Sequence, residues 1–242
     1  MPVFEAEPAF RAVSAPFSSL VRMGRAYGPV RGLFNLAMLL PLVALLAWSQ
    51  VASAAPAAPK LLLLGDSLTA GYGLPPTDGF VTRLRDGLRE RGLSPDVIDG
   101  GVSGDTTAGG LARIDWLLAE KPTHALVSLG ANDALRGLPP EQAYNNLDAM
   151  LTKLEQAGVE VLLAGMYAPP NLGADYGRAF SDIYRRLAEK HDVPLYPFFL
   201  DGVARDPALN QADGIHPNAK GVEIMVDRLM PHVVSLLNGG AG

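Results

Sequence analysis

The sequence contains no cysteine. That absence excludes cysteine nucleophiles, zinc–thiolate sites and disulfide bonds together, and it makes the chain indifferent to the redox state of its compartment. Strong charge of either sign is also lacking, because 25 acidic residues stand against 20 basic ones, with a net charge of -5 and no run of like charges. Without a basic patch, nucleic acid is not an expected partner.

Several sequence motifs with a known chemical use are missing as well. Neither G-x-x-x-x-G-K-[ST] nor G-x-G-x-x-G occurs in the chain. Both motifs cradle phosphates with backbone N–H groups, so their absence argues against a nucleotide-binding module. No G-x-S-x-G elbow surrounds Ser67 or Ser103, which excludes the α/β-hydrolase fold as the source of a serine nucleophile.

No apolar run is long enough to cross a membrane. The run Leu33–Trp48 has 16 residues and is interrupted by Asn35 and Pro41, whereas a bilayer needs roughly 20. Arginines precede the run, and Ala52-Ser53-Ala54 follows it with the small-x-small pattern that signal peptidase cleaves. These features predict an export signal, with an uncleaved membrane anchor as the alternative.

The chain divides into four parts on this basis. We expect a signal peptide over residues 1–54, whose translation start is either the first residue or Met23, and a short linker over residues 55–60. One folded domain is expected over residues 61–238, followed by a flexible tail over residues 239–242. The mature protein is then expected to be periplasmic or secreted, monomeric, and without stable membrane insertion.

Short apolar runs alternate with segments of helical period from Lys60 onward. Phe80, Leu84 and Leu88 recur every four residues, which indicates a helix between the first two strands. Repeated strand–helix units predict a parallel sheet of five strands with helices on both faces. The predicted strands are Leu61–Leu64, Val97–Ile98, Ala125–Leu129, Val159–Ala164 and Val193–Tyr196.

Polar residues follow three of these strands directly. Ser67 comes after the first strand, the segment Gly101–Thr107 after the second, and Gly130–Asp133 after the third. Ligands of such sheets bind beyond the carboxyl ends of the strands. We therefore expect these segments to meet at one edge of the sheet.

Ser67 and His216 are the candidate nucleophile and base. A hydroxyl group is a poor nucleophile at neutral pH unless a neighbouring base takes its proton, and histidine suits that role. Asp213 stands three residues before His216 in a glycine-containing loop, where its carboxylate can orient the imidazole. The alternatives are a serine that caps a helix and an Asx turn at Asp213. The other histidines, His124, His191 and His232, have no companions that suggest a metal or catalysis.

Two further residues can donate hydrogen bonds to an oxyanion. Gly104 can bring a bare backbone N–H close to a substrate, and Asn132 can donate from its side-chain amide. The alternatives are a flexible turn at Gly104 and a turn-forming role for Asn132.

Taken together, these motifs resemble the GDSL or SGNH hydrolases over Lys60–Leu237. The four blocks are Gly65-Asp66-Ser67-Leu68, Gly104, Gly130-x-Asn132-Asp133 and Asp213-x-x-His216, in that order. Three longer stretches are similar to the bacterial subgroup of periplasmic multifunctional acyl-CoA thioesterases, lysophospholipases and arylesterases. They are Ser103–Thr107, Gly110–Arg113 and Asp213–Asn218.

The resemblance implies a flavodoxin-like three-layer α/β/α sandwich and a serine hydrolase that needs no metal or cofactor. It implies that Ser67 is the nucleophile, that His216 is general base and then acid, and that Asp213 orients it. The oxyanion hole is then the N–H of Ser67, the N–H of Gly104 and the side chain of Asn132. Small esters and thioesters are the implied substrates, cleaved through an acyl-enzyme.

The apolar residues near these blocks favour an acyl chain over a sugar as the bound group. A carbohydrate acetylesterase with the same four blocks is the alternative within the enzymes, and a non-catalytic lipid- or glycan-binding module is the alternative outside them. The residues expected to contact substrate are Leu135, Leu138, Met166 and Ile215.

Overall fold

The computed structural model describes residues 58–240, all of which fall within the unit Pro56–Gly242. The predicted signal peptide, the first half of the predicted linker and the last two residues of the predicted tail lie outside the described residues. Within the described part, no helix has both the length and the apolar character needed to cross a membrane.

A five-stranded parallel sheet forms the centre of this unit, in the order β2-β1-β3-β4-β5. The predicted parallel sheet is therefore confirmed. The central residues of its middle strands are apolar because helices cover both faces; in β1, for example, Leu61 to Leu64 are fully buried. The strands are β1 (Lys60–Gly65), β2 (Asp96–Gly101), β3 (His124–Ser128), β4 (Glu160–Ala164) and β5 (Leu195–Tyr196).

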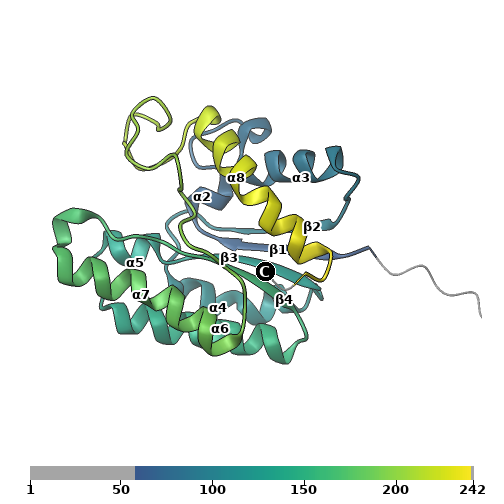
Figure 1. The fold of residues 1–242 in the computed structure, drawn as a ribbon, viewed down its shortest axis with the longest axis horizontal. Coiled ribbons are helices and arrows are strands. Elements are labelled where there is room, and N and C mark those ends of the chain that lie inside the picture. The colour runs from purple at the N-terminus through teal and green to yellow at the C-terminus, as the bar shows by residue number, and fades with distance from the viewer. Residues whose placement is uncertain (1–57, 241–242) are drawn as a thin grey trace, which may run out of the picture. The chain divides into compact units, whose positions relative to one another are not determined.

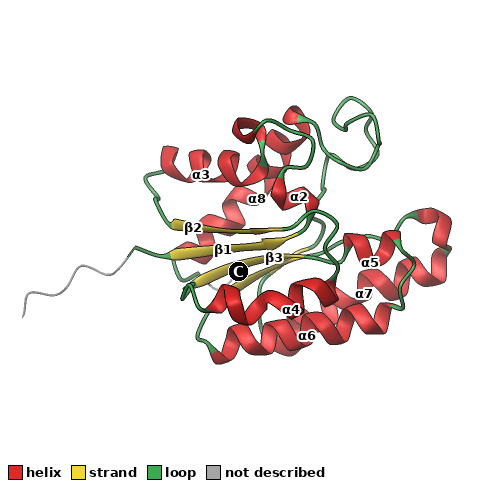
Figure 2. Ribbon diagram, turned by 180° about the vertical axis from the view of Figure 1, so that it is seen from behind, coloured by secondary structure: helices red, strands yellow, loops and turns green. Residues whose placement is uncertain are grey.

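Helices cover both faces of the sheet, so the unit is a three-layer α/β/α sandwich (Figure 1). One face carries α2 (Ser67–Ala70), α3 (Phe80–Glu90) and α8 (Ala219–Leu237). The other carries the remaining helices, as the view from behind also shows (Figure 2). They are α4 (Thr107–Leu118), α5 (Ala131–Leu135), α6 (Pro140–Gln156) and α7 (Ala174–His191).

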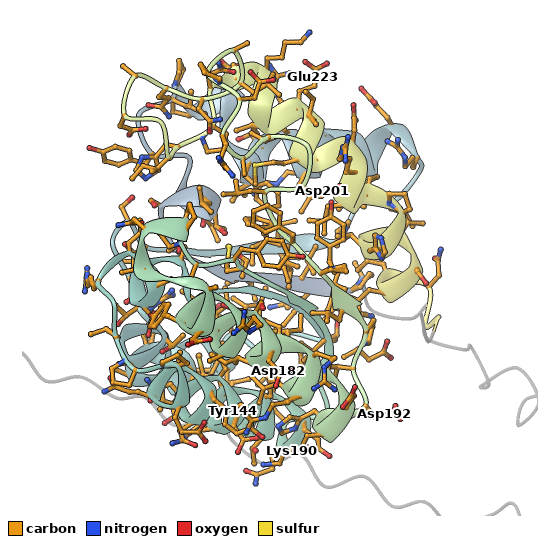
Figure 3. The ribbon with its side chains drawn as sticks, turned by 60° about the vertical axis from the view of Figure 1, so that its left-hand side comes forward. Tyr144, Asp182, Lys190, Asp192, Asp201 and Glu223 are labelled. Atoms are coloured by element: carbon orange, nitrogen blue, oxygen red, sulfur yellow. The ribbon has the colours of Figure 1, made fainter. Side chains whose placement is uncertain are left out.

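The predicted helical stripes face the sheet. Phe80, Leu84 and Leu88 of α3 have no exposed surface, and burial of each such side chain stabilises the fold by roughly 1.5–3 kcal/mol. Polar side chains lie on the outer faces of the helical layers. Figure 3 shows Lys190 of α7 in one layer and Glu223 of α8 in the other.

The last strand is shorter than predicted. The sequence indicates a strand over Val193–Tyr196, but β5 contains only Leu195 and Tyr196. The N–H of Val193 donates to the carbonyl of Ala188 at the end of α7 and is not available to the sheet. The neighbouring Pro194 has no N–H to donate.

Four short elements lie between the longer strands and helices. The helices α2 and α5 each form one turn directly after β1 and β3. Two 3-10 turns, η1 (Pro76–Asp78) and η2 (Pro170–Leu172), begin at prolines. Elements this short have no recognisable apolar period.

Candidate active site

Ser67 is the first residue of α2 and lies at the carboxyl end of β1. The carboxylate of Asp66 caps this turn by accepting a hydrogen bond of 3.0 Å from the N–H of Leu68. The turn ends at Gly71, whose φ of 70° is left-handed. The helix cap at this position is therefore Asp66, and the hydroxyl of Ser67 is available for other contacts.

A chain of hydrogen bonds joins Ser67, His216 and Asp213. Nε2 of His216 lies 3.0 Å from the Oγ of Ser67, and Nδ1 lies 2.6 Å from Oδ2 of Asp213. The loop before α8 thus brings together residues 149 positions apart in the sequence. A hydroxyl arranged in this way can give its proton to the imidazole as it attacks an electrophilic carbon.

The carboxylate of Asp213 is held by three donors. Besides the imidazole, the backbone N–H groups of Ile215 and His216 each donate to Oδ1 at 3.0 Å. The side-chain hydrogen bond from His216, followed by these backbone bonds, lowers the pKa of Asp213 to about 2. The Asx turn and the imidazole contact therefore coexist, and a different residue, Asn218, caps α8.

The imidazole of His216 also contacts an aromatic ring that sequence reasoning missed. The rings of Tyr72 and His216 lie 4.6 Å apart, centroid to centroid. Tyr72 is half exposed and lines the cavity beside the imidazole. Ring contacts between distant residues leave no pattern in a sequence, and no motif indicated this one.

Gly104 and Asn132 line the same cavity as Ser67. Gly104 has a φ of 80°, a conformation that favours glycine. Nδ2 of Asn132 donates to the carbonyl of Asp105 at 2.9 Å and lies 3.4 Å from the carboxylate of Asp66. Within residues 58–240, neither the N–H of Ser67 nor that of Gly104 has a backbone acceptor.

The cavity at this site has a volume of about 760 Å³ and is lined mainly by apolar groups. Of the four residues predicted to contact substrate, Leu135, Met166 and Ile215 line it. Leu138 is not among the lining residues, and its carbonyl accepts a hydrogen bond from the hydroxyl of Tyr176. Leu138 lies three residues beyond Leu135, where the chain has left α5.

A stacked aromatic pair forms part of the cavity wall. The rings of Tyr167, which follows β4, and Phe198, which follows β5, lie 4.3 Å apart. Leu200 and Arg205 from the same segment after β5 also line the cavity. This segment has no apolar period, and no pattern in the sequence indicated that it contributes to the site.

Asp66 is fully buried behind Ser67. Burial is the main cause that raises its pKa to about 6, while the hydrogen bond from Leu68 and the nearby imidazole of His216 oppose the rise. Asp66 therefore takes up a proton at a pH well above that of an ordinary carboxyl group.

The free energy of unfolding should depend on pH through this carboxyl group. Because the folded-state pKa of Asp66 is raised from 3.8 to about 6, the folded state binds more protons than the unfolded state between these values. The carboxyl group of Asp66 therefore contributes up to about 3 kcal/mol to the free energy of unfolding. This contribution is fully present below pH 4 and is lost as the pH rises through 6. Asp66→Asn, which keeps the cap, should gain stability relative to wild type over pH 4 to 6. Urea unfolding of both proteins across this range measures the difference, and a constant difference would contradict the prediction.

The other three histidines lie outside the cavity lining, as predicted. His191 contacts Asp148 at 2.7 Å, His232 packs against the ring of Tyr196, and His124 contacts the hydroxyl of Thr123. Among the described residues, no group of three or more histidine, cysteine or acidic side chains is placed to hold a metal ion.

Comparison with known proteins identifies the family. Residues 63–224 match the model of the GDSL-like lipase/acylhydrolase family. The chain belongs to this family. The predicted resemblance is thus confirmed, and the chain is an ester hydrolase of the GDSL type rather than a nucleotide-binding or non-catalytic module.

This chain covers almost the full length of the following relatives and solved structure of the family. An arylesterase of Vibrio mimicus is 40% identical over 197 residues, which are 79% of this chain and 98% of that protein. Esterase TesA of Pseudomonas aeruginosa is 42% identical over 182 residues, 75% of this chain and 90% of its own. A crystal structure of TesA superposes with a TM-score of 0.71 at 42% identity, covering 73% of this chain and 99% of that one.

Proposed function

We propose that the chain hydrolyses acyl esters and thioesters through an acyl-enzyme formed on Ser67. The observation that carries this proposal is the chain of hydrogen bonds from Ser67 through His216 to Asp213, at 3.0 and 2.6 Å, on the wall of an apolar cavity. A nucleophile, its base and the group that orients the base are thereby present in one place.

The proposed reaction has two halves. Oγ of Ser67 attacks the acyl carbon while Nε2 of His216 takes its proton, and the imidazolium then protonates the departing alcohol or thiol. Water attacks the acyl-enzyme with the help of the same imidazole, and the carboxylic acid leaves. Asp213, ionised at any pH above its lowered pKa of about 2, holds the imidazole in the required tautomer and stabilises the imidazolium.

Three donors are proposed to bind the oxyanion of each tetrahedral intermediate. They are the backbone N–H groups of Ser67 and Gly104 and the side-chain amide of Asn132. The two N–H groups have no backbone acceptor within the described residues. The amide of Asn132 donates to the carbonyl of Asp105 at 2.9 Å and makes a longer contact of 3.4 Å with the carboxylate of Asp66, whose place the oxyanion would take.

The apolar cavity supports an acyl chain as the part of the substrate that is recognised. Relatives of this chain carry the names arylesterase and, in Escherichia coli at 40% identity, thioesterase 1/protease 1/lysophospholipase L1. We infer that aryl esters, acyl thioesters and lysophospholipids are the substrate classes to test. A carbohydrate acetylesterase remains the second candidate. The catalytic residues and the proposed oxyanion-hole donors would contact only the reacting carbonyl group, which acetylated sugars also have.

Activity should rise with acyl length until the cavity is filled. Each buried methylene contributes up to about 0.8 kcal/mol, or roughly fourfold in kcat/KM. Leu135→Gln should reduce this gradient without affecting acetyl esters, since Leu135 lines the cavity. Rates for p-nitrophenyl esters of two to ten carbons measure the gradient, with Leu138→Gln, outside the lining, as the matched control. Faster hydrolysis of acetylated sugars than of all these esters would favour the acetylesterase instead.

We also propose that the mature enzyme is exported. The basis is the arginine-preceded run Leu33–Trp48 and the cleavage pattern Ala52-Ser53-Ala54. Mature protein from the periplasm of a bacterial host should begin at Ala55, as measured by N-terminal sequencing. Recovery of the intact run in a membrane fraction would support the anchor alternative. A monomeric state and the absence of a nucleic-acid partner stay predictions.

A further inference from the structure

Arg113 of α4 joins two segments of the site without lining the cavity. Its Nε donates to Oδ2 of Asp105 at 2.7 Å, and its terminal nitrogen donates to the carbonyl of Gly65 at 3.0 Å. Gly65 is the last residue of β1, two positions before Ser67. One guanidinium group thus connects the loop after β2 to the strand end that carries Ser67.

Asp105 connects the same loop to a third segment. Its backbone carbonyl accepts the hydrogen bond from the amide of Asn132, and it follows Gly104 directly. Its carboxylate is accommodated closely by α4, because a Cβ at Gly109 would overlap it. The Ser67 turn, the Gly104 loop and the Asn132 turn therefore all meet at the contacts of Asp105 and Arg113.

This ion pair differs from the others on α4. The side chains of Arg113 and Asp105 are only 20% and 11% exposed. The pair between Lys153 and Asp115, also on α4, has side chains 39% and 75% exposed. Solvent screens the second pair, whereas removing one partner of the first leaves a charge in a poorly hydrated place.

We propose that Arg113 is a positioning residue that, through Asp105, holds the oxyanion hole in its productive geometry. The proposal rests on the function proposed above for Gly104 and Asn132. Hydrogen-bond donors stabilise a developing charge only when they are already aimed at it, to within about 0.5 Å. Without the guanidinium, the loop keeps its backbone hydrogen bond from Val102 to Gly65 at 3.1 Å but loses the contact that ties Asp105 itself to β1. The donors at Gly104 and Asn132 then lose their fixed spacing from Ser67.

The first test is a comparison of kcat and KM. Arg113→Met keeps an unbranched stem close to that of arginine and removes the guanidinium group with its charge and donors. We expect kcat for p-nitrophenyl butyrate to fall at least tenfold while KM stays within threefold, because the oxyanion is present only in the transition state. Asp115→Asn, which removes the exposed pair on the same helix, is the matched control and should change kcat less than twofold. An unchanged kcat in folded Arg113→Met would overturn the proposal.

The second test is a double-mutant cycle with Asn132→Ala. If Arg113 acts through the oxyanion hole, Arg113→Met should lower kcat much less in the Asn132→Ala protein than in wild type, because one positioned donor is already absent. Independent, multiplying effects would overturn the proposal. Asp105→Asn supplies the same cycle if Arg113→Met does not fold, as judged by circular dichroism.

These results are distinguishable from a failure of the proposed function itself. If the nucleophile is assigned wrongly, Ser67→Ala keeps its activity whatever Arg113 does. If only the positioning role is wrong, Ser67→Ala is inactive and Arg113→Met retains wild-type kcat.

Discussion

Ser67→Ala and His216→Ala should each lower kcat for ester hydrolysis by at least about 10³-fold, with the fold intact. Removing the hydroxyl removes the atom that forms the acyl-enzyme. Removing the imidazole leaves the hydroxyl without a base and the leaving group without an acid. Because the two act in one step, the double variant should lose little more activity than either single variant.

The measurement is steady-state hydrolysis of p-nitrophenyl butyrate, together with mass spectrometry after reaction with a fluorophosphonate. Wild type should gain one adduct, located on Ser67. Ser103→Ala is the matched control, because Ser103 lines the same cavity but has no role in the proposed mechanism. Retention of more than about a tenth of wild-type kcat by folded Ser67→Ala or His216→Ala would refute the role of that residue.

The central strands were predictable because each is buried on both faces. Leu61–Leu64 is an uninterrupted apolar run, and such a run has few interpretations when glycine follows it. The prediction for β5 is too long because backbone hydrogen bonds, and not apolar character, decide where a strand begins. The N–H of Val193 donates to the carbonyl of Ala188 in α7, so it cannot donate to a neighbouring strand.

The local part of the site was predictable for a different reason. Asp213 and His216 lie within one turn of chain, so their spacing alone allows the carboxylate to reach the imidazole. Contacts between separate segments gave no such signal. The contact of Tyr72 with His216 and the bridge from Arg113 to Gly65 depend on how β1, α4 and the loop before α8 meet in space.

The raised pKa of Asp66 is another property that the sequence pattern could not predict. The residue is one position from the predicted nucleophile, and its type is plain in the sequence. Its pKa depends on burial, which arises only when α2 and the strands pack around it. A sequence pattern identifies a carboxyl group, whereas its protonation state follows from the tertiary structure.

Asn132→Ala should lower kcat by about 10²- to 10³-fold and leave KM within about threefold. The ground-state carbonyl of an ester carries little charge and gains little from the amide. The oxyanion carries a full charge, so the lost hydrogen bond costs energy mainly in the transition state. The carbonyl of Asp105 already orients the Nδ2 group at 2.9 Å, so the amide needs to give up only its longer contact of 3.4 Å with the carboxylate of Asp66 as the charge develops.

A variant of the cavity wall, Leu135→Ala, should behave differently from Asn132→Ala. Leu135→Ala removes apolar contact that substrate and transition state share, so it should raise KM for long acyl esters and leave kcat nearly unchanged. Asn132→Asp replaces the donor by a group that bears negative charge at neutral pH, and it should be at least as inactive as Asn132→Ala. Michaelis–Menten curves for the three variants separate the two effects. A rise in KM with unchanged kcat in Asn132→Ala would mean that its amide binds the substrate uniformly and is not part of an oxyanion hole.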